Sequence, residues 1–247
     1  MIKIPTLSFC ITCKDRFYQI SRTLKKNLDD NRLHKELIEF VLVDFGSKDG
    51  LRDWIIFDFA DDLDSGYLRY YYTEEQSLWH AAICKNTPHY CANNDIVVNL
   101  DCDNYVGFLG GQYVIRQFME NRNIFFHQFC GDLSDGTLGR ISILKERFEF
   151  VGGYNESLER LGFEDLDLIE RLQAIKLKYL KSSNKRFSSA IRNPSPEGFD
   201  ALNVVNSKTS KLNINEGRII ANNGIYGIRK NLFDYKGKLY QKGLRID

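Results

Sequence analysis

Residues 95–107 read DIVVNLDCDNYVG, an apolar run typical of a buried strand that ends in two closely spaced carboxylates. Asp101 and Asp103 stand two residues apart, so on an extended chain both side chains project from one face, while Cys102 projects from the other. Carboxylate oxygens on one face can bind a hard cation such as Mg²⁺ or Mn²⁺ together with a diphosphate. Two aspartates at this spacing often occur by chance in loops. Because Asp101 and Asp103 lie at the end of a predicted strand, they are better evidence of a cation-binding site.

Runs of similar character precede this stretch at regular intervals. The runs rich in β-branched and aromatic residues are 7–12, 38–44, 68–72 and 95–100, helices are expected near 15–28, 49–60, 79–92 and 108–120, and GRISILK (139–145) contains a further expected strand. We therefore predict an α/β fold with a Rossmann-like, mostly parallel sheet flanked by helices. Ligands bind such sheets at the carboxyl ends of the strands, so residues directly after each strand are candidates for a site.

The composition is that of an ordinary globular protein, with 43% hydrophobic and 27% charged residues among 247. No run approaches 18 apolar residues, so no membrane-spanning helix is expected. We expect the first 14 residues to form a buried strand rather than an export signal, which favours the cytoplasm. Six irregularly spaced cysteines favour reduced thiols there. Cys10 and Cys13 form a CxxC pair, but a strand would point their sulfurs to opposite faces, which disfavours zinc.

Charge is divided unevenly along the chain. Residues 1–175 carry 19 Lys and Arg against 28 Asp and Glu, whereas residues 176–245 carry 15 against 4. A basic C-terminal region is consistent with a solvated surface, and equally with contact to an anionic membrane or to a phosphate-bearing ligand. The acidic remainder would repel a phosphate backbone, so nucleic acid is not an expected partner. Residues 193–198, NPSPEG, are the strongest loop signal.

Acidic residues also follow the second expected strand and open a later helix. Asp44 ends the run of VLVDFGSKDG (41–50), where a carboxylate can accept from a uracil imide or from ribose hydroxyls. Ser47 and Asp49 fit a turn and helix cap better. Glu164 and Asp165 begin the other helix, where the macrodipole alone favours acids. The same dipole keeps a carboxylate ionised, as a general base in glycosyl transfer must be.

Three segments together resemble an inverting family-two glycosyltransferase of the GT-A fold, with a galactosyltransferase-type C-terminal half. They are DFGSKDG (44–50), HAAICKNTPHYCANNDIVVNLDCDN (80–104) and RFEFVGGYNESLERLGFEDLDLIERL (147–172). The resemblance covers roughly residues 5–175. It implies a domain over 1–175, with a nucleotide-binding half at 1–104 and an acceptor-side half at 105–175. Residues 176–247 would then be a basic extension packed on the same domain.

The resemblance implies a role for each matching residue. Asp101 and Asp103 would bind Mn²⁺ or Mg²⁺, and Asp101 would also contact ribose; Asp165 would be the general base; Glu164, Gly153 and Tyr154 would bind the acceptor, with the aromatic ring stacked on a sugar; and Thr12, Lys14, Arg16, Asp44, Lys85 and Asn86 would bind the nucleotide. The cation would offset charge on the departing nucleoside diphosphate.

The chain departs from this family pattern at three points. Phe45 stands where a second acid usually follows Asp44. No histidine follows the acidic pair as a third metal ligand, which leaves diphosphate, water or an asparagine for that role; the asparagines considered are Asn193, Asn222 and Asn223. No QxxRW motif follows the base, which disfavours a processive synthase.

The resemblance implies transfer of one sugar from a UDP-sugar (Gal, GalNAc, Glc or GlcNAc type) to a hydroxyl of a glycan or lipid-linked glycan. The setting would be bacterial surface polysaccharide assembly at the inner face of the membrane. A sugar-phosphate nucleotidyltransferase is one alternative, although ITCKDRFYQ (11–19) lacks the glycine expected after its first strand. A non-catalytic nucleotide- or glycan-binding protein is another.

Overall fold

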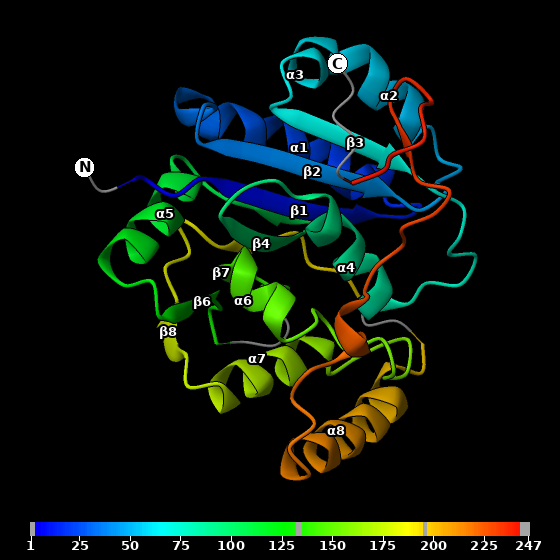
Figure 1. Cartoon of the computed structure of the whole chain (residues 1–247). Coiled ribbons are helices and arrows are strands. Elements are labelled where there is room, and N and C mark those ends of the chain that lie inside the picture. Colours follow the sequence, from blue (N-terminus) through cyan, green and yellow to red (C-terminus); the bar gives the residue numbers. More distant parts are fainter. Residues whose placement is uncertain (1–2, 132–134, 195–196, 243–247) are drawn as a thin grey trace.

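The computed structural model describes residues 3–131, 135–194 and 197–242, and its centre is an eight-stranded sheet (Figure 1). In spatial order the strands are β10 (Phe233–Asp234), β3 (Leu68–Tyr72), β2 (Ile38–Asp44), β1 (Leu7–Cys13), β4 (Ile96–Asp101), β7 (Ile141–Leu144), β6 (Ile124–Gln128) and β8 (Lys178–Ser182). The four strands from β3 to β4 are parallel, and β6 and β8 pair in parallel. Strands β7 and β10 run antiparallel to their neighbours. The predicted α/β fold with a mostly parallel sheet is confirmed.

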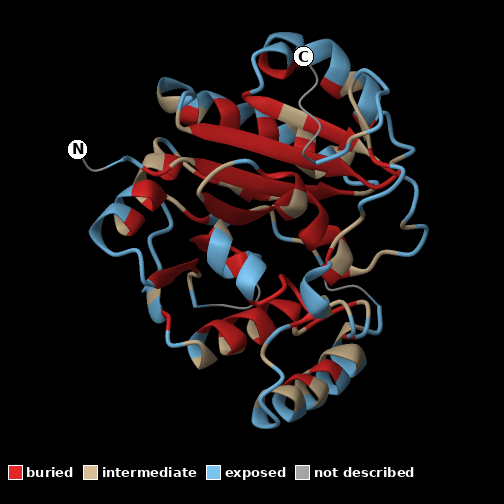
Figure 2. Cartoon of the chain, viewed as in Figure 1, coloured by how far each residue is buried: buried red, intermediate tan, exposed pale blue. Residues whose placement is uncertain are grey.

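Helices cover both faces of this sheet. One face packs on α1 (Phe17–Asn31), α2 (Leu51–Asp58), α3 (Ala60–Asp64) and α5 (Gly110–Glu120), and the other on α4 (Ala81–Cys91), α6 (Lys145–Phe150) and α7 (Glu164–Ala174). The strands are therefore buried on both sides, as Figure 2 shows for the central four. Cys10 and Cys13 pack into clusters on opposite faces, as predicted, and all six cysteines are free.

Residues after 175 contribute to both edges of the sheet. Strand β8 pairs with β6 at one edge, and β10 pairs with β3 at the other. Between them, α8 (Phe199–Asn215) packs on α7. The remaining short elements are β5 (Asn104–Tyr105) paired with β9 (Ser189–Ala190), and the 3₁₀ turns η1 (Arg32–His34) and η3 (Asn222–Gly224). The basic region is thus interwoven with the rest of the fold.

Several elements escaped prediction, and for two of them, α8 and β8, the structure gives a physical reason. The buried side chains of α8 are Asn206 and Ser210, so this helix lacks the apolar stripe by which helices are recognised. Strand β8 lies at a sheet edge, and three of its five residues are exposed, Lys178 and Lys181 among them. Within the three described ranges, no helix is long and apolar enough to cross a membrane.

Candidate functional site

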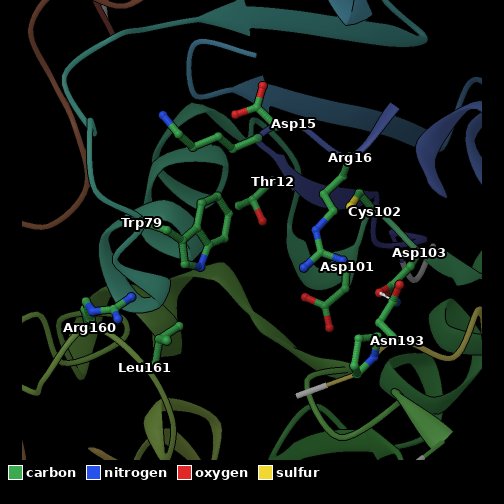
Figure 3. A pocket seen from close by; sticks show the side chains of 12 residues that line it. Thr12, Asp15, Arg16, Trp79, Asp101, Cys102, Asp103, Arg160, Leu161 and Asn193 are labelled. Carbon is green, nitrogen blue, oxygen red and sulfur yellow. Dashed lines mark hydrogen bonds between the residues drawn. The ribbon is translucent and has the colours of Figure 1, made fainter. Parts of the chain in front are cut away.

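A cavity of about 440 Å³ opens at the carboxyl ends of β1 and β4, where the topology predicts a ligand. Its walls come from the loop after β1, the turn after β4, the segments before α4 and α7, and the chain after β9 (Figure 3). The lining residues are Thr12, Lys14, Asp15, Arg16, Trp79, Asp101, Cys102, Asp103, Arg160, Leu161, Asn193 and Pro194. The structure therefore brings together five predicted residues: Thr12, Lys14, Arg16, Asp101 and Asp103.

The two aspartates stand close together at the edge of this cavity. Asp101 is the last residue of β4, and Asp103 lies in the turn that follows. Asn193 Nδ2 donates to Asp103 Oδ2 at 2.6 Å, and Asn104 Nδ2 donates to Asp103 Oδ1 at 2.6 Å. Burial, together with the negative charge of Asp101, raises the pKa of Asp103 to about 6. A cation bound between the two carboxylates would remove this repulsion.

These carboxylates fit a hard divalent cation. Their oxygens are the ligand type that Mg²⁺ and Mn²⁺ prefer. Across the described part of the chain, no group of three or more His, Cys, Asp or Glu side chains is placed to bind a metal. Of the asparagines considered, Asn193 lines the cavity beside Asp103. Asn222 donates instead to the carbonyls of Gly152 and Tyr154.

The predicted base lies directly behind the aspartate pair. A Cβ atom built on Gly139 would lie 2.9 Å from Asp101 Oδ2 and 3.3 Å from Asp165 Oδ2, so these oxygens are no more than about 6 Å apart. Glycine at this position leaves room for both carboxylates. Asp165 keeps 8% of its surface exposed. One edge of the sheet thus presents a cation-binding pair and a carboxylate capable of proton transfer within one small volume.

Lys85 joins the acidic pair of α7 into a buried cluster. Its Nζ donates to Asp165 Oδ1 at 2.6 Å, to Asp165 Oδ2 at 2.8 Å and to Glu164 Oε1 at 2.9 Å. Burial opposes the charge on Lys85, but the two carboxylates outweigh it and raise its pKa. Burial, with the charges of Glu164 and Asp101, raises the pKa of Asp165 to about 7 in spite of Lys85. Asp165 can therefore accept a proton near neutral pH.

This cluster corrects the nucleotide contacts expected of Lys85 and Asn86. All three protons of the Lys85 ammonium are donated to carboxylates, so the side chain is bound within the protein. Asn86 is fully buried, and its amide bridges Tyr154 and Glu156. Lys85 positions the acidic pair, whereas Asn86 supports the following turn. The contacts of both side chains are therefore internal to the protein.

Asp44 forms its hydrogen bonds within the protein, which corrects its expected contact with uracil. It is fully buried, and it accepts from Ser47 N at 2.8 Å and from Tyr70 Oη at 2.8 Å. Ser47 and Asp49 do not cap α2, because their side chains accept from the backbone N–H groups of Asp15 and Phe17. The segment after β2 therefore fixes the shape of the loop after β1, which lines the cavity.

The turn at Gly152 and Gly153 is structural, which corrects two acceptor contacts. Both residues have positive φ (75° and 70°), and added Cβ atoms would lie 2.0 Å from Ala221 O and 2.5 Å from Asn86 Oδ1, so only glycine fits. Tyr154 is fully buried and cannot stack on a sugar. Glu164 is also buried and bonded to Lys85, so its predicted acceptor contact is not available in this arrangement.

Sequence reasoning missed several residues of the site. Trp79 and Arg160 line the cavity from loops that lack any strand-end pattern. Arg140 is buried near Asp101 and Asp103. Burial lowers the pKa of its guanidinium to about 10, although the charges of the two aspartates act in the opposite direction. Phe45, noted only as a departure from the family, packs edge-on against Trp79 with ring centroids 5.8 Å apart. In the sequence, the one signal for the wall formed by Trp79 is the aromatic residue Phe45, which directly follows the strand-end aspartate Asp44.

Comparisons with known proteins agree with this arrangement. Residues 127–193 match the model of the N-terminal domain of galactosyltransferase. No curated protein matches the chain in sequence. The fold is similar to mannosyltransferase PcManGT from Pyrobaculum calidifontis, solved with GDP-Man and Mn²⁺, at 15% identity and a TM-score of 0.61, over 81% of this chain and 60% of that chain.

Two structures of S. aureus TarS are similar as well. One matches at 16% identity and a TM-score of 0.66, over 85% of this chain and 39% of that chain. The other, TarS 1–349 with UDP-GlcNAc, matches at 14% identity and a TM-score of 0.60, over 77% of this chain and 60% of that chain. The chain thus spans about 60% or less of the length of these neighbours. These structural neighbours are glycosyltransferases of the GT-A fold, so the chain has a GT-A fold, and residues 127–193 resemble a galactosyltransferase domain; the predicted resemblance is confirmed at this level.

Proposed function

We propose that this protein transfers a single sugar from a UDP-sugar, of the Gal, GalNAc, Glc or GlcNAc type, to a hydroxyl of a glycan or lipid-linked glycan, with inversion. The observation that carries the proposal is the closeness of Asp165 to Asp101, which lines the cavity together with Asp103. A direct displacement needs a base for the acceptor hydroxyl and stabilisation of the leaving diphosphate. Asp165 would supply the first, and the two cavity aspartates with a bound cation would supply the second.

In this mechanism, Asp165 takes the proton from the acceptor hydroxyl. The hydroxyl oxygen then bonds to the anomeric carbon, while the bond from that carbon to the nucleoside diphosphate breaks on the opposite face. Lys85 keeps both oxygens of Asp165 fixed and balances the charge of Glu164. Asp101 and Asp103 would bind Mn²⁺ or Mg²⁺, which supplies charge stabilisation to the leaving group. Arg16 is the cavity cation nearest this pair in Figure 3, and its charge lowers the pKa of Asp103.

Thermal unfolding tests the donor site. With UDP and Mn²⁺ together, the melting temperature is expected to rise by several degrees, because a ligand that binds only the folded state stabilises it. Asp103→Ala removes one of the two carboxylates and should abolish the Mn²⁺-dependent part of the rise. GDP and CMP serve as comparisons, since the structural neighbours were solved with GDP-Man and UDP-GlcNAc. A larger shift with GDP than with UDP would contradict the proposed donor.

We also propose that the basic residues of 176–245 face an anionic membrane surface during assembly of a bacterial polysaccharide. Lys178 and Lys185 are exposed in this region. Replacing both by glutamate is expected to weaken flotation with anionic vesicles roughly tenfold or more, since each lysine contributes about 1 kcal/mol near such a surface. Arg116→Glu with Arg122→Glu is the matched control in the acidic part of the chain. Absence of flotation by the unmodified protein would refute the proposal.

A further inference from the structure

One wall of the cavity has no role in the chemistry described so far. It consists of Trp79, from the segment before α4, and of Arg160 and Leu161, from the segment before α7. In Figure 3, Arg160 and Leu161 lie across the cavity from Asp103 and Asn193, and Trp79 lies between these two sides. A flat aromatic side chain therefore stands beside a guanidinium at the end of the cavity away from the cation-binding pair.

The guanidinium of Arg160 is unpaired among the described residues. It forms no hydrogen bond and lies beyond 4 Å from every described carboxylate, although the residue is half-buried. The two buried arginines differ, because Arg140 donates to Asn104 and Arg171 donates to Asp167. A guanidinium offers a planar set of donors that matches a carboxylate or phosphate. An unpaired one that lines a cavity is suited to bind an anion there.

The backbone that carries Arg160 is fixed, so the side chain is presented from a defined point. Its carbonyl accepts from Ala81 N at 2.8 Å. Asn206 of α8 accepts from Glu159 N at 2.6 Å and donates to the carbonyls of Glu159 and Leu161, each at 3.0 Å. A site built on fixed backbone loses less conformational entropy when it binds.

We infer that Arg160 and Trp79 form a subsite for an acceptor sugar that carries an anionic group, a carboxylate or a phosphate. The inference rests on the proposed function, because it places the acceptor on the side of the base. Arg160 lies five residues before Asp165 on the same segment, whereas Arg16 is the cation near Asp103, where the donor diphosphate would lie. The indole face packs on the sugar ring while the guanidinium binds the anion.

Binding of three simple sugars tests the subsite. Methyl glucoside, glucuronic acid and glucose 6-phosphate are titrated by calorimetry, both with UDP and Mn²⁺ and without them. An anionic sugar is expected to bind about 10- to 100-fold more tightly than the neutral one, as is typical of a hydrogen bond to a charged group. The better of the two anions identifies carboxylate or phosphate as the recognised group. Arg160→Gln should remove the preference and Arg160→Lys should retain part of it, while Arg116→Gln, at an exposed position on α5, should have no effect.

Two results would overturn the subsite. One is equal binding of the neutral and anionic sugars by the unmodified protein. The other is a loss of UDP affinity in Arg160→Gln as large as in Arg16→Gln, which would make Arg160 a diphosphate ligand. Failure of UDP to bind the unmodified protein would refute the proposed donor, yet an Arg160-dependent preference for the anionic sugar without nucleotide would still support the subsite. The two failures are therefore distinguishable.

Discussion

Replacing Asp165 by asparagine is expected to lower the turnover number of sugar transfer by about 10² to 10⁴, the contribution typical of a general base. The amide cannot take the proton of the acceptor hydroxyl, yet it has the same shape as the carboxylate. Asp103, Asp101 and the loop after β1 are unchanged, so the UDP affinity measured with Mn²⁺ should remain within about twofold. Initial rates at saturating donor, together with calorimetric titration of UDP, measure the two quantities separately.

Glu170→Gln is the control for this substitution, because it removes a carboxylate from the same helix at a half-buried position outside the cavity. It should leave turnover unchanged. A fall in UDP affinity as large as the fall in turnover for Asp165→Asn would mean that Asp165 serves the donor rather than the acceptor. Unchanged turnover in Asp165→Asn would remove Asp165 as the base, whereas absence of turnover in the unmodified protein would favour a binding protein.

The pH dependence of kcat/KM provides a second check on this base. Burial raises the pKa of Asp165 to about 7, and only the ionised carboxylate accepts a proton. As the pH falls through about 7, the ionised fraction decreases, so kcat/KM should fall about tenfold for each further pH unit. In Asp165→Asn this limb should disappear from the residual activity. A plateau that continued to pH 5 would contradict the assignment.

The parallel strands and the position of the cavity could be predicted because both follow from local patterns. Each parallel strand is a short apolar run, and a carboxylate that directly follows one must lie at the common edge. Asp101 and Asp103 lie there for this reason, and Asp165 follows from the helix that it opens. The edge of the sheet that holds the cavity could therefore be located from sequence alone.

The contacts within the site could not be predicted, because they join residues far apart in the chain. Lys85 looks like a nucleotide ligand until α7 brings two carboxylates to its ammonium, across about 80 residues. Asp44 looks exposed until Tyr70 and Ser47 cover it. Tyr154 is buried because the preceding glycine turn directs it inward. No local pattern reports which polar group a distant element will satisfy.

The position of α7 also depends on contacts between distant residues, because a buried ion pair adds to the hydrophobic contacts of this helix. Asp167 and Arg171 are both almost fully buried on this helix, with Arg171 Nε donating to Asp167 Oδ2 at 2.7 Å. The other guanidinium nitrogens donate to Val151 O at 2.9 Å and to Gly153 O at 2.7 Å. Ser210 of α8 donates to Asp167 Oδ1 at 2.7 Å. One ion pair thus connects α7, the glycine turn and α8.

Arg171→Met is therefore expected to lower the free energy of unfolding by about 3–5 kcal/mol, the typical result of leaving one partner of a buried pair without the other. The carboxylate of Asp167 would stay buried with one hydroxyl donor, the carbonyl of Gly153 would lose its donor, and the carbonyl of Val151 would keep only Ala221 N. Urea unfolding monitored by fluorescence measures the difference. Arg147→Met, at an exposed arginine of α6, should cost less than about 1 kcal/mol.

A double variant separates the ion pair from the carbonyl bonds of Arg171. If the unpaired charge of Asp167 dominates the loss, adding Asp167→Asn to Arg171→Met should recover part of the lost stability. If the lost bonds from Arg171 to the carbonyls of Val151 and Gly153 dominate, the second substitution should recover nothing, because it restores neither bond. A cost below about 1 kcal/mol for Arg171→Met would contradict both accounts. It would mean that the glycine turn and α7 keep their relative position through the apolar contacts of Leu168 and Leu172 alone.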